Sequence, residues 1–134
     1  MRNLINIRLP GPLNTSLNED LWWIQVDDND EIRALKPMIT MQGVSLEGED
    51  WGGDLLSPRG VDLQMNGGLG LCFTDFNVEQ LPQLNALLDL LWSDGVEAIS
   101  PTLVSCSVSS FRKSLMAFRQ ARKHSSEKRC KLLG

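Results

Sequence analysis

The clearest pattern of hydrophobic and polar positions lies between residues 60 and 66. Three apolar side chains alternate there with three polar ones: Val61, Leu63 and Met65 with Asp62, Gln64 and Asn66. A period of two places successive side chains on opposite faces, so we predict a β-strand with one apolar and one polar face. A glycine-rich turn at residues 67–70 follows. Asn66-Gly67 is also a hairpin signal, but the helical pattern that soon follows favours a turn that leads into a helix. A parallel barrel strand whose polar end faces a site has this arrangement.

After the turn, the spacing of apolar positions changes to steps of three and four residues. The apolar positions are Val78, Leu81, Leu84, Leu87, Leu88 and Leu91. This spacing predicts an amphipathic helix. Asn77 and Gln80 have the spacing of a capping box, and Asp94-Gly95 provides a stop. Because proline fits only the first turn of a helix, the helix begins at Pro82 or bends there.

The remaining segments continue the alternation of strand and helix. Residues 96–100 predict a short strand that Pro101 closes, and residues 131–133 begin another apolar run. Between them a second helix is predicted from about Ser107, with Val108, Phe111, Leu115 and Phe118 on one face. The order β-α-β-α-β over residues 58–134 is the opening of a parallel α/β arrangement.

Residues 1–57 have a different pattern and are predicted to form a β-rich subdomain. Strands are expected at residues 4–9, 21–26 and 31–35, and residues 43–58 are a glycine-containing loop. The turn-forming residues Asp27-Asp28-Asn29-Asp30 predict a hairpin between the second and third strands. A calcium loop is the alternative for so many carboxylates, but the spaced acidic ladder and the distal glutamate of such loops are missing.

Composition places the chain among ordinary globular proteins. It has 134 residues, of which 42% are hydrophobic and 22% charged. No apolar run approaches the roughly 20 residues that cross a bilayer, and the first ten residues lack the continuous apolar stretch of a secretory signal. Cys72, Cys106 and Cys130 are too widely spaced for a disulfide framework. We therefore expect a cytoplasmic protein with three buried free thiols and no membrane partner.

Charge is distributed unevenly. Residues 1–111 hold 16 acidic and 5 basic side chains, whereas residues 112–134 hold 1 acidic and 8 basic ones. A basic tail is one way to bind nucleic acid. Here several cations lie on the predicted second helix near its C-terminus, where they suit the helix dipole, and no aromatic residue follows Phe118. We expect a solvated helix face and no nucleic-acid partner.

Few residues offer catalytic chemistry. His124 is the only histidine, and one histidine with three scattered cysteines does not build a usual zinc site. The serine motif of a nucleophile elbow is missing. The glycine-rich turn at residues 67–70 fits neither a Walker loop nor a dinucleotide fingerprint, although it could hold an anion or a protein partner. A small non-catalytic binding module that uses this turn is the alternative function.

The polar face at residues 62–66 remains as a candidate site. The amides of Gln64 and Asn66 can hydrogen-bond a metal-bound water or a substrate. The alternative is a polar strand face that water or neighbouring backbone satisfies.

Two motifs give the chain a family resemblance. Residues 58–68, Pro-Arg-Gly-Val-Asp-Leu-Gln-Met-Asn-Gly-Gly, resemble the first barrel strand of the amidohydrolase superfamily, with Gln64 and Asn66 at its His-x-His positions. This Gln-x-Asn-Gly variant is similar to N-acetylglucosamine-6-phosphate deacetylases, as is the Pro-Thr-Leu ending within residues 95–104. Residues 23–35 resemble the N-terminal β-subdomain that flanks the barrel. Arg59 departs from the family, which usually has glycine there.

The resemblance implies an α/β fold: an N-terminal β-sandwich-type subdomain over residues 1–57, followed over residues 58–134 by the first β/α units of an incomplete TIM (β/α)8 barrel. It also implies a hydrolase of linear amides that converts N-acetylglucosamine 6-phosphate to glucosamine 6-phosphate and acetate. A divalent metal such as zinc polarises the water and the amide carbonyl, and a carboxylate serves as general base.

The metal ligands and the general base of the family are expected beyond Gly134. Leu132-Leu133-Gly134 resemble the residues just before the first ligand segment. Within this chain the resemblance therefore implies no catalytic or certain metal-binding residue, and leaves substrate-binding residues unassigned. Gln64 and Asn66 are implied only as neighbours of the metal site. We expect the chain alone to be inactive and to hold no cofactor.

Partners follow from the same expectation. The complete enzyme would bind an amino-sugar phosphate. Three strands of a barrel leave parallel edges and apolar helix faces uncovered. A homo-oligomer or a complementing C-terminal portion is therefore expected to cover them.

Overall fold

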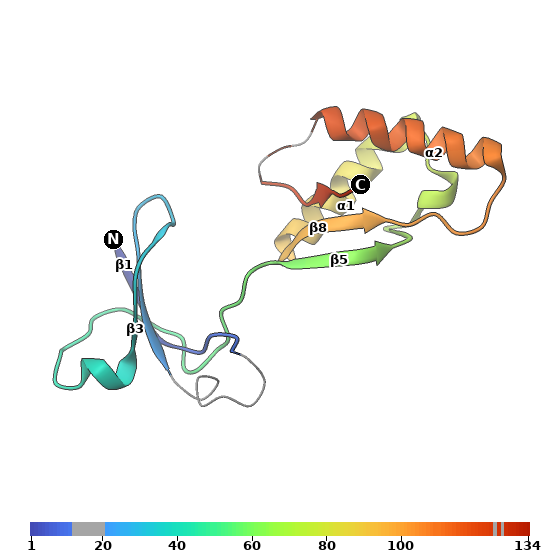
Figure 1. Cartoon of the computed structure of the whole chain (residues 1–134). Helices are drawn as coiled ribbons and strands as arrows, with labels where there is room; N and C mark the ends of the chain where they lie inside the picture. Colours follow the sequence, from blue (N-terminus) through green and yellow to red (C-terminus); the bar gives the residue numbers. More distant parts are fainter. Residues whose placement is uncertain (12–20, 125, 127) are drawn as a thin grey trace. The chain divides into compact units, whose positions relative to one another are not determined.

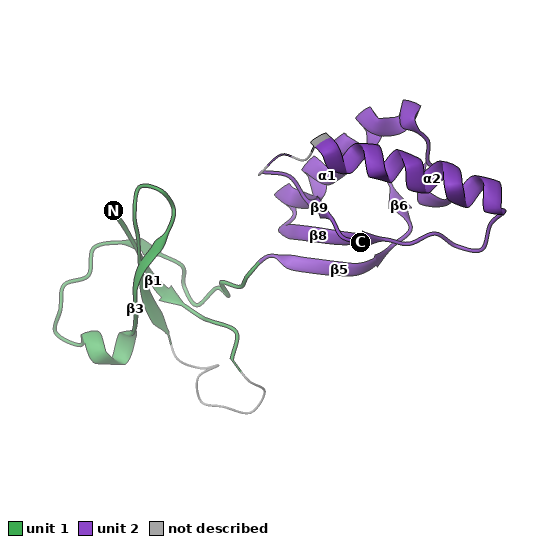
Figure 2. Cartoon of the chain, turned by 45° about the horizontal axis from the view of Figure 1, so that its top comes forward, with its two compact units in different colours: residues 1–58 green, residues 59–134 purple. Residues whose placement is uncertain are grey.

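The computed structural model describes residues 1–11, 21–124, 126 and 128–134. The chain divides into two compact units, Met1–Pro58 and Arg59–Gly134 (Figure 2). This boundary lies one residue beyond the division expected from the sequence. Across the described ranges, every helix is too short or too polar to cross a lipid bilayer.

The first unit is a small sheet with the strand order β3-β2-β1-β4. Its strands are β1 (Arg2–Ile7), β2 (Trp22–Val26), β3 (Ile32–Pro37) and β4 (Glu49–Asp50), and the 3-10 helix η2 (Met38–Met41) follows β3. β2 is antiparallel to both of its neighbours, whereas β4 is parallel to β1. One face is closed by a core of buried side chains, Leu4, Ile7, Ile24 and Val26.

A sandwich needs two facing sheets, and the described residues of this unit form only one. The β-sandwich-type prediction is corrected to a single four-stranded sheet for these residues. The sandwich was expected from the family resemblance and not from the strand pattern, because alternation along a strand reports two faces but not what covers the second face.

The acidic run between β2 and β3 closes a hairpin, as predicted. The Asp27 carboxylate accepts hydrogen bonds from the backbone N–H groups of Asn29 and Glu31, at 2.8 and 3.0 Å. The N–H of Glu31 is the main reason that the pKa of Asp27 lies below its ordinary value, and Arg33 and the N–H of Asn29 add to it. The carboxylates thus serve the turn and its ion pairs, which explains the run without a calcium ion.

The second unit contains a parallel sheet with the order β5-β8-β9, made of β5 (Gly60–Met65), β8 (Val96–Pro101) and β9 (Lys131–Leu132). Helix α1 (Leu81–Ser93) connects β5 to β8, and helix α2 (Val108–Ala121) connects β8 to β9 (Figure 1). Both helices lie over the same face of the sheet (Figure 2).

Short elements fill the connections of this unit. They are the two-residue strands β6 (Gly67–Gly68) and β7 (Leu71–Cys72) and the 3-10 helices η3 (Phe73–Asp75), η4 (Val78–Gln80) and η5 (Arg122–His124). Pro82 falls in the first turn of α1, as its missing N–H requires. The predicted capping box of Asn77 and Gln80 is present, but it caps η4 rather than α1 itself.

The core of the second unit joins the helices to the sheet. Phe73, Phe76, Leu84 and Ile99 have no exposed surface. The ring of Phe118 meets that of Phe73 edge-on, with 5.1 Å between centroids, and lies 4.7 Å from that of Phe76. This packing fixes α2 against the loop that follows β5, so the carboxyl end of the sheet has a firm support.

Candidate functional site

The candidate site lies at the carboxyl end of β5. Gln64 lies in the strand, and Asn66 directly follows its last residue; both are exposed. The backbone N–H of Thr102, just after β8, donates to the carbonyl of Met65 at 2.7 Å. The Pro-Thr-Leu segment at residues 101–103 therefore lies beside Gln64 and Asn66, which joins the two motifs that carry the family resemblance. Parallel sheets commonly bind ligands at this end of their strands.

Buried polar contacts hold this end of the sheet in place. The Phe73 N–H donates to the Asn66 carbonyl at 2.9 Å. The Ser114 hydroxyl, fully buried in α2, donates to the Thr74 carbonyl at 2.9 Å, and the Thr74 hydroxyl accepts from the N–H of Val104 at 3.2 Å. This support is not among the features predicted from the sequence. A serine on the buried side of a predicted amphipathic helix is the signal that could have found it.

Asp62, the third polar residue of the strand, has a local role. Its carboxylate accepts a hydrogen bond from the backbone N–H of Gln64 at 2.9 Å. The ladder between β5 and β8 changes register between Asp62 and Met65. A bulge interrupts the strict alternation of side chains along a strand. The pairing of β5 with β8 therefore does not support the prediction that Asp62, Gln64 and Asn66 share one face. Of the three, Gln64 and Asn66 lie nearest the end of the strand.

The glycine-rich turn is a hairpin rather than a direct entry to a helix. Gly67 pairs with Cys72 and Gly68 with Leu71, and Leu69 and Gly70 form the two-residue turn with φ of 50° and 77°. Two positive φ values are those of a type I′ turn. The 3-10 helices η3 and η4 separate this turn from α1, so it does not place an anion at the N-terminus of that helix.

Packing accounts for two of the glycines. A Cβ on Gly67 would lie 2.0 Å from the Leu71 carbonyl oxygen, and one on Gly68 would lie 2.8 Å from a methyl carbon of Leu87. The close approach of neighbouring backbone and side-chain atoms therefore explains why these two positions are glycine, without a bound ligand.

The described side chains do not fit a divalent metal centre. No group of three or more histidine, cysteine, aspartate or glutamate side chains comes together among them. All three cysteines are free thiols, but of the three expected to be buried only Cys130 is, whereas Cys72 and Cys106 are exposed. Burial raises the pKa of Cys130, with the charge of Asp62 adding to this. A thiol that stays protonated is a poor ligand. Gln64 and Asn66 offer amide hydrogen bonds, which can orient a water or a substrate but not activate one.

Comparison with known proteins addresses the family directly. No family model matches the chain. An N-acetylglucosamine-6-phosphate deacetylase of Caenorhabditis elegans is 35% identical over 79 residues, and one of Mus musculus is 32% identical over 101 residues. The resemblance to N-acetylglucosamine-6-phosphate deacetylases is confirmed. The matches cover 57% and 75% of this chain, which spans 18% and 24% of the two deacetylases.

A solved structure extends the likeness to nearly the whole chain. The crystal structure of N-acetylglucosamine-6-phosphate deacetylase from Pasteurella multocida matches 93% of this chain and 31% of its own, with a TM-score of 0.52 and 18% identity. At that identity the likeness concerns the fold alone. The deacetylase fold agrees with the mixed α/β architecture of several sheets.

Proposed function

We propose that the chain is an N-terminal portion of an N-acetylglucosamine-6-phosphate deacetylase. In this proposal residues 58–134 are the first β/α units of a TIM (β/α)8 barrel, and residues 1–57 are the subdomain that flanks it. The parallel order β5-β8-β9 with two crossover helices supports the barrel. The match to only a third or less of each related deacetylase supports its being a portion.

The complete enzyme would hydrolyse the acetamide of the amino-sugar phosphate with the help of a divalent metal. This chain would supply the carboxyl end of the first strand, where Gln64 and Asn66 orient a water or a substrate group by amide hydrogen bonds. Its described residues supply no cluster that could hold the metal. That observation carries the proposal that the 134-residue chain is inactive by itself. A cytoplasmic location, suggested by the three free thiols, belongs to the same proposal.

The test is a hydrolysis assay of the purified chain. The chain is incubated with N-acetylglucosamine 6-phosphate and Zn²⁺, and acetate is measured, with the mouse deacetylase as positive control. We expect acetate release by the control and none above buffer by the chain. Metal-dependent release by the chain, lost on addition of a chelator, would show that the proposal of inactivity is wrong.

A further inference from the structure

Asn66 precedes a backbone nitrogen with which its own side chain can react. Among the asparagines of the chain, only Asn66 is followed directly by glycine, and its side chain is exposed. The side-chain amide carbon of an asparagine lies within reach of the backbone nitrogen of the next residue, and a glycine there has no Cβ to crowd the approach. The pair Asn66-Gly67 is therefore chemically labile wherever this nitrogen is free to attack.

The hairpin that follows β5 leaves this nitrogen free. In an antiparallel pair of strands, hydrogen-bonded pairs of residues alternate with pairs that exchange no hydrogen bond. The N–H of Phe73 donates to the Asn66 carbonyl at 2.9 Å, so Asn66 and Phe73 form a hydrogen-bonded pair. Gly67 and Cys72 are the next pair toward the turn. They therefore exchange no hydrogen bond, and the N–H of Gly67 points away from β7.

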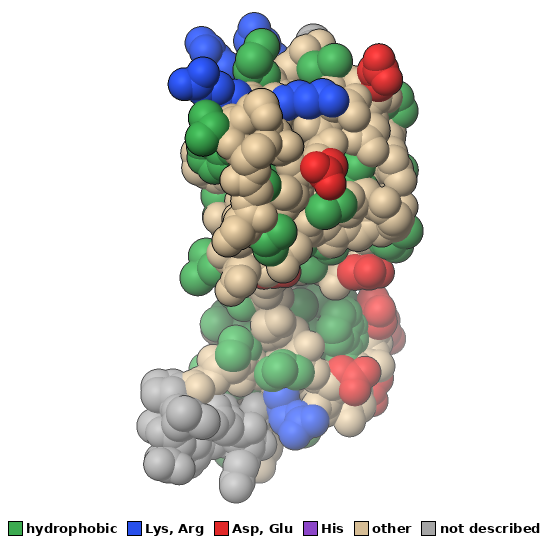
Figure 3. Space-filling view, turned by 90° about the vertical axis from the view of Figure 1, so that its right-hand side faces the viewer, with side chains coloured by type: hydrophobic (Ala, Val, Ile, Leu, Met, Phe, Trp, Pro, Cys, Tyr) green, Lys and Arg blue, Asp and Glu red, His purple; other side chains and the backbone are tan. Residues whose placement is uncertain are grey.

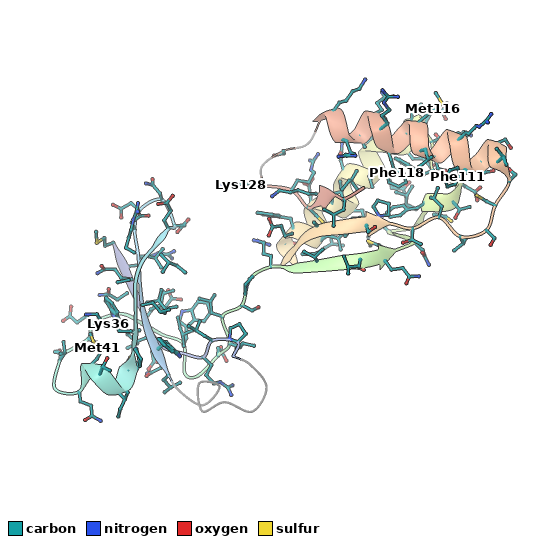
Figure 4. The ribbon with its side chains drawn as sticks, in the orientation of Figure 1. Lys36, Met41, Phe111, Met116, Phe118 and Lys128 are labelled. Atoms are coloured by element: carbon teal, nitrogen blue, oxygen red, sulfur yellow. The ribbon has the colours of Figure 1, made fainter. Side chains whose placement is uncertain are left out.

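The core holds this pairing in place. Phe73 has no exposed surface and meets the ring of Phe118 edge-on. Figure 4 shows Phe118 directed from α2 toward the sheet. Because Phe73 is fixed in the core and binds the Asn66 carbonyl, the alternation that frees the nitrogen of Gly67 persists in the folded chain.

An exposed asparagine in the first unit has the opposite arrangement. Asn29 lies in the turn between β2 and β3, and its side chain is exposed. The backbone N–H of the next residue, Asp30, donates to the Asp27 carbonyl at 3.1 Å. This hydrogen bond occupies the nitrogen, and the side chain of Asp30 crowds it. Exposure of an asparagine is therefore not sufficient to make it reactive.

We propose that Asn66 deamidates spontaneously in the folded chain because the hairpin leaves the nitrogen of Gly67 free. This nitrogen loses its proton to water or hydroxide and bonds to the side-chain amide carbon of Asn66. The C–N bond of the side-chain amide breaks, and its nitrogen takes up a proton and leaves as ammonia. Water then opens the succinimide ring at one of its two carbonyls. The product is aspartate, or isoaspartate in which the backbone runs through the former side chain.

Deamidation changes the carboxyl end of β5. Figure 3 views the side toward which β5 points in Figure 1, and most of the surface of the second unit there is uncharged. A new carboxylate appears at this end, and an amide that donates and accepts hydrogen bonds becomes a group that only accepts. Isoaspartate also lengthens the backbone and so disturbs the pairing with Phe73. The reaction does not depend on the proposed hydrolytic function, although it alters one residue of that site.

The experiment follows the purified, folded chain during incubation at neutral and at mildly alkaline pH. Digestion and mass spectrometry locate each asparagine that has become an acid, and chromatography separates aspartate from isoaspartate. We expect Asn66 to react first, about tenfold or more faster than Asn29. The rate should rise with pH, because the attacking nitrogen must lose its proton. Asn66→Gln, whose longer side chain does not form the same ring, should show no isoaspartate at this position.

Asp30→Gly is the matched control, because it creates a second asparagine–glycine pair whose N–H is hydrogen-bonded. Asp30 has a φ of 63°, which glycine adopts freely, and its ion pair with Arg2 is exposed. Circular dichroism checks that the variant is folded. Asn66 should still react about fivefold or more faster than Asn29 in the folded variant, because only Asn29 must first break a hydrogen bond. In urea, where this difference is lost, the two rates should become similar.

Two results would overturn the proposal. Asn66 could stay intact in the folded chain and react only in urea, which would mean that the hairpin protects it. Asn29 could react as fast as Asn66 in the folded Asp30→Gly variant, which would mean that the residue pair alone, and not the free nitrogen, determines the site of reaction.

Discussion

At the scale of single residues, close packing determines how well a glycine tolerates replacement. Gly67 has a φ of 148°, and a Cβ there would lie 2.0 Å from the Leu71 carbonyl oxygen. Gly95 also has a positive φ, of 84°, but a Cβ there would meet nothing within 4 Å. The first position combines backbone strain with a clash, whereas the second involves strain alone.

We therefore predict that Gly67→Ala lowers the free energy of unfolding by about 3 kcal/mol or more, because the carbonyl cannot move without breaking the hairpin. Gly95→Ala, the control, should cost about 1 kcal/mol, the usual strain of a left-handed residue. Urea denaturation of both variants measures the difference. Equal losses would mean that the hairpin relaxes freely around an added methyl group.

At the scale of elements, α2 shows that helical periodicity predicts where a helix begins better than which of its faces is buried. The helix was predicted from about Ser107, and it begins at Val108 with Ser107 as its cap. The predicted apolar face is only partly buried: Phe118 is 8% exposed, whereas Val108, Phe111 and Leu115 are 68%, 45% and 47% exposed. The side that packs most closely includes Ser114 and Ala117, both fully buried, because small residues let the helix approach the Phe73–Asp75 segment (η3), where Ser114 bonds to Thr74.

The two phenylalanines of this helix should therefore differ sharply. Phe118→Ala removes a ring that packs on Phe73 and Phe76, and should cost about 3–5 kcal/mol of unfolding free energy. Phe111→Ala changes a half-exposed ring and should cost less than about 1.5 kcal/mol. Thermal unfolding followed by circular dichroism compares them. Similar losses would show that Phe111 is more buried in solution than this packing allows.

At the scale of the whole molecule, the chain has two cores that share no residue. One contains Ile24 in the first unit, and the other contains Leu84 in the second. Three of the four tryptophans, Trp22, Trp23 and Trp51, are in the first unit, and both α-helices are in the second. Tryptophan fluorescence and the helical signal in circular dichroism thus report mainly on different units.

We predict that each core governs its own unfolding transition. Ile24→Ala should shift the fluorescence transition and leave the helical signal almost unchanged, and Leu84→Ala should do the reverse. Each substitution should cost about 2–5 kcal/mol within its own unit. If either variant shifts both signals together, the chain unfolds as one cooperative body.

The sequence by itself determined the order of the longer strands and helices, the hairpin at Asp27 and the family resemblance. Periodicity, capping residues and short motifs are local properties, and local properties are visible in sequence. Gln64 and Asn66 were located in the same way, because a strand pattern and a motif coincide there.

Only the tertiary structure decided which faces are covered. It brings Thr102 beside Met65, buries Ser114 against Thr74 and leaves Val61 and Leu63 exposed on β5. It also assigns the described part of the first unit to a single sheet and the glycine-rich turn to a hairpin. These outcomes depend on contacts between residues far apart along the chain, and the period of a single segment contains no information about what packs against it.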